Sequence, residues 1–174
     1  MTLDKLMIRF SDGDVSAFGD IYAQTRKTVY FIALSIVKEK PLAEDVMQSA
    51  YLDVIKNPSK YRAGTNAAAW IARIAKNEAL ALKKKRGREF YVDEHENLNV
   101  FGTEQTDDFG LLTETAKKFL PEDEFLILML AASEGYNRRA IAELLDMPVP
   151  TVTWKYKRAT EKMRDVFRDG FGEE

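Results

Sequence analysis

The sequence lacks cysteine and contains a single histidine, His95, among its 174 residues. The absence of cysteine excludes disulfides and thiolate metal sites, and one imidazole is too few for a histidine metal cluster. No pairing of a nucleophile with a base and no glycine-rich phosphate loop is evident in the chain. We therefore expect no metal, no cofactor and no enzymatic activity.

Long apolar runs are also missing. The longest one, residues 29–37, is interrupted by Ser35 and falls well short of the roughly 20 residues that a membrane-spanning helix needs. The N-terminus shows no charged segment followed by an apolar one, as a signal peptide would. Because 45% of the residues are hydrophobic, the chain can bury one moderate core or two small ones. We expect a globular cytoplasmic protein without membrane insertion.

The net charge of −2 conceals an uneven distribution along the chain. Residues 1–88 hold 16 Lys and Arg against 9 Asp and Glu, residues 89–119 hold 2 against 8, and residues 120–174 hold 8 against 11. A basic block followed by an acidic segment indicates a polyanion-binding domain beside a segment that avoids polyanions. Chance clustering on an ordinary solvated surface is the alternative interpretation.

Apolar residues recur at helical spacing through most of the chain, and no segment shows the alternation of a strand. The periodicity and the turn residues predict helices over residues 3–10, 16–38, 41–56, 66–86, 111–119, 121–132, 137–146 and a basic one ending near 168. Between them, residues 89–110 are acidic and without periodicity, which is typical of a linker. The predicted fold is all-α, with helical domains at 1–88 and 111–174 joined by this flexible acidic linker.

Two segments near the C-terminus, residues 138–145 and 151–159, predict a helix-turn-helix. Ala142 is small where the helices would cross, and the start of the second helix carries hydroxyl and basic side chains that can reach base edges and phosphates. Residues 150–164 hold five basic groups against Glu161 alone, which favours DNA binding over a hairpin packed only for stability. Trp154 either faces DNA or packs against the first helix. The candidate residues are Arg138, Thr151, Thr153, Trp154, Lys155, Lys157 and Arg158.

The helix at residues 66–86 is the most basic element of the first half. Basic side chains attract phosphates, while aromatic and amide groups hold unstacked bases. Trp70 equally fits a core position, because it lies among Ile71 and Ile74. The candidate DNA-binding residues of this region are Tyr61, Arg73, Lys76, Asn77, Lys83, Lys84, Lys85 and Arg86.

The early turns of the helix at residues 41–56 carry Glu44, Asp45 and Gln48. Asp45 and Gln48 are three residues apart, so they are neighbours on one helix face. Taken alone, this pattern also describes an ordinary solvated surface.

The order of these three elements resembles that of the extracytoplasmic-function sigma factors. Ala43-Glu44-Asp45-Val46-x-Gln48 is similar to their polymerase-clamp-binding motif, and residues 69–77 with the following basic run are similar to their promoter-opening helix. Residues 120–164 resemble their second domain, which reads the upstream promoter element.

The resemblance implies a subunit that directs core RNA polymerase to specific promoters and opens the DNA. Glu44, Asp45 and Gln48 would contact the coiled coil of the β′ clamp, and the second domain would meet the β flap. Lys76, Asn77 and the cluster up to Arg86 would meet the downstream promoter element, with a flipped base held by the loop within residues 57–68. An anti-sigma factor is a further implied partner.

Two other functions fit parts of the sequence. A sigma-like adaptor would sequester an anti-sigma factor without binding polymerase, and Ser49, where the family commonly has an acidic residue, leaves room for it. The complete basic cluster and recognition helix argue against such an adaptor, which needs no DNA-contacting charge. A self-sufficient helix-turn-helix regulator should carry a dimerisation helix or a ligand pocket, and neither is evident.

Overall fold

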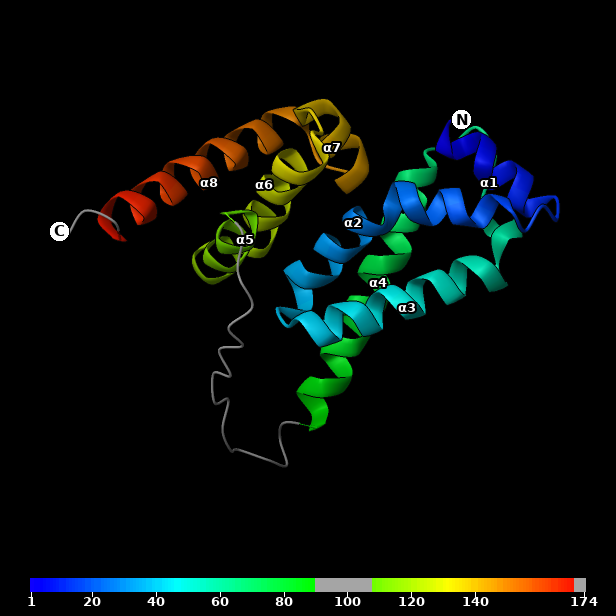
Figure 1. Ribbon diagram of the computed structural model, residues 1–174, viewed down its shortest axis with the longest axis horizontal. Helices are drawn as coiled ribbons and strands as arrows, with labels where there is room; N and C mark the ends of the chain where they lie inside the picture. The colour runs from blue at the N-terminus through cyan, green and yellow to red at the C-terminus, as the bar shows by residue number, and fades with distance from the viewer. Residues whose placement is uncertain (90–107, 171–174) are drawn as a thin grey trace.

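The computed structural model describes residues 1–89 and 108–170, and both ranges are helical with no strand (Figure 1). This confirms the predicted all-α fold class. The elements are α1 (Leu3–Ser11), α2 (Ala17–Val37), α3 (Lys40–Lys56), the short 3-10 helix η1 (Pro58–Lys60), α4 (Ala67–Glu89), α5 (Asp108–Phe119), α6 (Glu122–Glu134), α7 (Arg138–Leu145) and α8 (Val149–Gly170).

The region expected to be a linker is only partly described. Residues 90–107 lie outside the described residues, as does His95. At the two ends of this region the helices extend further than the sequence predicted: α4 continues through Gly87 to Glu89, and α5 already begins at Asp108.

Capping residues satisfy backbone groups at several helix ends. The side chains of Asn66 and Asn137 accept hydrogen bonds from the backbone N–H groups of Ala69 and Ala140, both at 2.9 Å. Each amide oxygen thus satisfies one backbone donor that the first helical turn leaves unpaired. Gly135 ends α6 in the left-handed conformation with φ of 64°, which glycine adopts without strain.

The first half is built around α2, against which α1, α3 and α4 pack. The apolar side chains of α2 meet buried residues of α3 and α4 that are mostly small, including Ala50 and Ala79. At one end of this core the Tyr51 hydroxyl lies 2.8 Å from Thr25 Oγ1. Burial raises the pKa of Tyr51 to about 12, so this phenol stays protonated and can donate a hydrogen bond inside the core.

The second half is centred on α6, whose residues 124–130 are all buried. A helix that is apolar on every side must be covered from several directions. Helices α5, α7 and α8 cover part of α6, with Val152, Ala159 and Met163 of α8 in the shared core. The remaining side of α6 packs against α2 of the first half.

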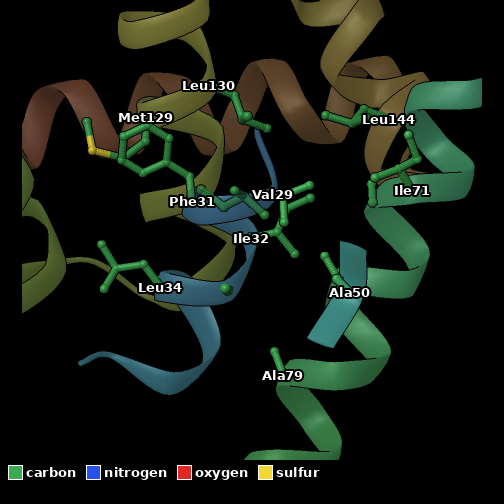
Figure 2. Packing of buried hydrophobic residues seen from close by; sticks show 14 of the residues in the cluster. Val29, Phe31, Ile32, Leu34, Ala50, Ile71, Ala79, Met129, Leu130 and Leu144 are labelled. Carbon is green, nitrogen blue, oxygen red and sulfur yellow. The ribbon is translucent and has the colours of Figure 1, made fainter. Parts of the chain in front are cut away.

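The two halves, which the sequence predicts as helical domains joined by a linker, are packed against each other. The Phe31 ring of α2 lies 6.5 Å from Phe125 and 6.2 Å from Phe109, measured between ring centroids. Helices α4 and α7 also touch, and Figure 2 shows Leu144 facing Ile71. One apolar cluster runs through both halves, so each half completes the core of the other.

Two further properties of the described residues concern membranes and metal ions. None of the described helices is both long and apolar enough to cross a membrane. Within residues 1–89 and 108–170, no three His, Cys, Asp or Glu side chains lie close enough together to hold a metal ion.

The fully buried Phe125 provides a test of this core. Phe125→Ala should lower the free energy of unfolding by about 3–5 kcal/mol, because it leaves a cavity and removes the contact with Phe31. Urea denaturation measures this change. Phe119→Ala is the matched control, since Phe119 is exposed on the neighbouring helix and its loss should cost much less. Equal losses in the two variants would contradict the packing described.

Candidate nucleic-acid interface

Helix α4 has one apolar face and one basic face. Ile71, Ala75 and Ala79 are buried against the rest of the first half. Arg73, Lys76 and Asn77 are exposed on the other side. The small alanines let α4 approach its neighbours closely, and this packing fixes the direction in which the basic face points. The candidate residues of this helix thus form one surface.

The C-terminal turns of α4 carry the lysine cluster, residues 83–86. Lys83, Lys84 and Lys85 are exposed and Arg86 is half-buried. Two of these groups are paired: Lys83 Nζ lies 2.7 Å from Glu122 Oε1 of α6, and Arg86 Nη1 lies 3.5 Å from Glu39 Oε1. The cluster is therefore accessible to phosphates, but Lys83 already has a carboxylate partner from the second half.

The loop before α4 is held by Tyr61, which the sequence offered as a DNA-contacting residue. Its side chain is buried, and its hydroxyl donates to the Thr65 carbonyl at 2.9 Å and contacts the Asp4 carboxylate. Burial, together with the hydrogen bond to Asp4, raises the pKa of Tyr61 to about 12. Its ring packs edge-on against Trp70 at 5.6 Å. The rings of Tyr61 and Trp70 thus pack on the inner side of the loop and support it.

Above these rings the loop itself is open to solvent. Residues 62–66 are exposed, and Gly64 has φ of 79°, in the left-handed region that favours glycine. Thr65 Oγ1 donates to the Arg62 carbonyl at 2.7 Å, which closes the turn. The loop thus presents backbone and short polar groups beside the basic face of α4.

The exposed side of α3 carries Glu44, Asp45 and Gln48. Leu52 and Ile55 follow on the same stripe and are also exposed, at 45% and 44%. The spacing of these two apolar residues fits a core face equally well, so the sequence alone does not reveal that they are exposed. The combined stripe of polar and apolar side chains is the kind of surface that binds another protein.

Helices α7 and α8 form the predicted helix-turn-helix (Figure 1). Asp146 ends α7 in the left-handed conformation with φ of 53°, and the Met147 N–H donates to the Ala142 carbonyl at 2.9 Å. Helix α8 then begins at Val149, with Pro150 in its first turn, where the missing N–H costs no helical hydrogen bond. Ile141 and Val152 fill the space between the two helices.

Two basic residues of α8 are anchored by the first turn of α6. Lys155 Nζ forms an ion pair with Asp123, and Arg158 Nε lies 3.5 Å from Glu124 Oε1. Burial alone would raise the pKa of Asp123, but the hydrogen bond and charge of Lys155 outweigh it and hold that pKa below its usual value. The Lys155 side chain is only 20% exposed and the Glu124 residue 3%. These acids orient α8 on the second half.

Most of the other candidates on the helix-turn-helix are exposed, as Arg158 itself is. Thr153, Trp154 and Lys157 are exposed on α8, Trp154 at 53%. The Arg158 guanidinium lies 4.6 Å from the centroid of the Trp154 ring, and Arg138 lies 4.4 Å from that of Tyr156. Thr151 is half-buried at the start of the helix. Trp154 thus packs against α8's own arginine and leaves half of its surface to solvent.

The sequence matches known proteins along nearly its whole length. Residues 21–89 match the family model for Sigma-70 region 2. The RNA polymerase sigma factor CarQ of Myxococcus xanthus is 27% identical, over 92% of this chain and 94% of that protein. The ECF RNA polymerase sigma factor SigW of Bacillus subtilis is 25% identical, over 97% of this chain and 98% of that protein. The chain belongs to the extracytoplasmic-function sigma factors of the sigma-70 family.

Solved structures share the fold of this sigma factor. The sigma factor RpoE of Bartonella quintana, crystallised with the anti-sigma factor NepR, matches with a TM-score of 0.65 and 19% identity, over 88% of this chain and 98% of its own. CnrH in complex with the cytosolic domain of CnrY matches with a TM-score of 0.68 and 17% identity, over 95% and 97%. The family consists of non-catalytic polymerase subunits.

The Asp123–Lys155 pair predicts a dependence of stability on pH. The pKa of Asp123 is lower in the folded protein than in the unfolded chain. Its ionised carboxylate therefore stabilises the fold fully above the pKa of an unfolded aspartate, and this stabilisation is lost as the pH falls through the folded pKa. Asp123→Asn should therefore cost about 1 kcal/mol at neutral pH, and the difference from wild type should shrink in acid. Urea unfolding at several pH values measures this, with Asp165→Asn on the exposed part of α8 as control. A difference that is constant with pH would contradict it.

Proposed function

We propose that this sigma factor directs core RNA polymerase to specific promoters through three surfaces: α3 for polymerase, α4 for the downstream element and α8 for the upstream element. The basic face of α4, opposite its alanine-rich buried face, is the observation that carries the proposal. Residues 1–88 would act as region 2, which the family match at residues 21–89 supports. Residues 111–174 would act as region 4, together with the start of α5.

The stripe on α3 is the proposed contact with the coiled coil of the β′ clamp. Glu44, Asp45 and Gln48 supply hydrogen-bond acceptors and an amide, while Leu52 and Ile55 supply apolar area that is open to solvent in the free subunit. Burying apolar area on binding is favourable by about 25 cal/mol per Å². Polar groups at the rim then set the register of the two proteins.

Replacing Asp45 and Gln48 together by alanine should weaken binding to core polymerase about tenfold or more, as the loss of two contacts of roughly 1 kcal/mol each implies. Titration of labelled sigma factor with core polymerase measures the affinity. The matched control is Asp20→Ala with Gln24→Ala, the same residue types exposed on α2. Unchanged affinity of the folded α3 variant would place the polymerase contact elsewhere.

The two DNA-binding surfaces should contribute differently. Lys83, Lys84 and Lys85 are exposed positive charges near the end of α4, so they should supply an attraction to DNA that falls with salt and does not depend on sequence. Thr153, Trp154 and Lys157 face outward from the start of α8, where side chains reach base edges. Lys155 and Arg158 are held in place by ion pairs with Asp123 and Glu124. In this proposal they contribute to DNA binding from those fixed positions.

Transcription by reconstituted holoenzyme over a library randomised in the upstream element separates these contributions. Alanine at all three lysines should reduce transcription from every promoter and flatten its dependence on salt. Thr153→Ala or Lys157→Ala should change the preferred upstream sequence, by about 1–3 kcal/mol per base contact. A uniform loss in the α8 variants, with no change of preferred sequence, would make these residues phosphate contacts only.

An anti-sigma factor is the remaining proposed partner, because the sigma factors in the matched structures are bound to such proteins. The proposed location is the cytoplasm, where polymerase acts, and the β flap is the proposed contact of the second half. The second candidate is an adaptor that sequesters an anti-sigma factor, which Ser49 leaves open. Run-off transcription with purified core polymerase on genomic fragments decides between them: transcripts support the sigma factor, and their absence despite anti-sigma binding supports the adaptor.

A further inference from the structure

A cavity of about 160 Å³ lies where α1, α2 and α4 meet the turn between α6 and α7. Its volume is close to the roughly 150 Å³ of an engineered protein cavity that binds benzene. The space therefore suits a molecule about as large as one six-membered ring. The apolar part of its lining consists of Leu3, Val29, Ala68, Ile71 and Ala72.

The rest of the lining is polar and consists of Gln24, Thr25, Thr28 and Tyr136. Thr25 Oγ1 donates to a carbonyl of its own helix and lies 2.8 Å from the Tyr51 hydroxyl, so it is already satisfied. Thr28 Oγ1 lies 3.4 Å from the Tyr136 hydroxyl, which is long for a hydrogen bond between hydroxyls. Each hydroxyl offers one donor and two acceptor sites, so Thr28 and Tyr136 can bond a further polar group.

The end of α6 places the Tyr136 side chain at this cavity. Gly135 ends the helix in the left-handed conformation, and the Tyr136 N–H donates to the Leu130 carbonyl at 3.4 Å. Tyr136 is half-buried, and Thr28 is buried on α2 with 3% of its surface exposed. The two hydroxyls therefore lie side by side in the cavity wall, one from each half of the protein.

The lining also limits the charge of an occupant. Among the described residues that form it, none carries a charged side chain. An ion moved into such surroundings loses its hydration without gaining a counter-charge, which is costly. Water could bond the hydroxyls, but beside the apolar side chains it lacks partners, and an apolar group that displaces such water gains affinity.

We propose that this cavity binds one small uncharged molecule that has an apolar ring and a hydroxyl group. The ring would rest against Val29 and Ile71, and the hydroxyl would bond Thr28 and Tyr136. The inference is independent of the proposed contacts with polymerase and DNA, and neither depends on it. Phenol has the required size and chemistry and serves as the probe. A molecule of this size that fits well should bind with a dissociation constant of about 1 mM or below.

Titration of the isotope-labelled full-length protein with phenol, followed by backbone amide NMR spectra, tests the site. We expect saturable shift changes at the amides of Thr28, Ala68 and Tyr136, which all line the cavity. The amide of Thr153, exposed on α8, should not change. Changes that do not saturate, or that are equally large at Thr153, would overturn the inference.

Filling the cavity should abolish this binding. Ala68→Leu enlarges a side chain of the lining and should weaken phenol binding about tenfold or more, because the ring no longer fits. Ala69→Leu is the matched control, since it makes the same change at the next residue of α4, outside the cavity lining. The NMR spectra also show whether each variant is folded. Equal affinities of the two folded variants for phenol would overturn the site.

A second variant tests the polar contact without filling the cavity. Tyr136→Phe removes the hydroxyl and keeps the ring. It should weaken phenol binding about two- to tenfold, as the loss of one hydrogen bond implies, and leave benzene binding unchanged. Equal losses for phenol and benzene, or no loss for either, would overturn the role assigned to the hydroxyl and with it the proposed class of ligand.

Discussion

The C-terminal half of α2 is apolar on every side, and the arrangement of both halves depends on covering it. Residues 31–36 are buried without interruption, which no single neighbour can achieve for a helix. Helices α1, α3 and α4 cover part of its surface and α6 covers the rest. Helix α6 has the same property over residues 124–130. Helices α2 and α6 therefore each cover the apolar surface that the other leaves open. Separating the halves would expose Phe31 and Phe125 to water.

Apolar burial and ion pairs both contribute to the free energy of the contact between the two halves. The ion pairs between the halves involve lysines that are more than half exposed, and such pairs contribute about 0–1 kcal/mol each. Burial of an aromatic side chain such as Phe31 contributes about 1.5–3 kcal/mol. Apolar contact therefore holds the halves together, and the ion pairs at its edge contribute little.

The sequence predicted the helices but not their long-range partners, and the difference has a physical cause. Periodicity and the capping residues Asn66, Asn137 and Gly135 act within a few residues, so local spacing reveals them. Glu124 stands in the first turn of α6, where a negative charge complements the helix dipole, but it is also buried and pairs with Arg158 of α8. Tyr61 beside a basic helix suggested a platform for bases, but contacts with Asp4 and Thr65 bury it. Asp4 and Arg158 are distant in sequence from Tyr61 and Glu124, so these contacts leave no local signal.

The first turn of α6 serves two surfaces at once. Glu122 faces α4 across the contact between the halves, while Asp123 and Glu124 hold Lys155 and Arg158 of α8. The pairs that orient α8 lie entirely within the second half, so they do not depend on how the halves are arranged. Thr153, Trp154 and Lys157 are exposed in the packed structure. The surface proposed for the upstream element is therefore formed and open to solvent while the two halves are packed against each other.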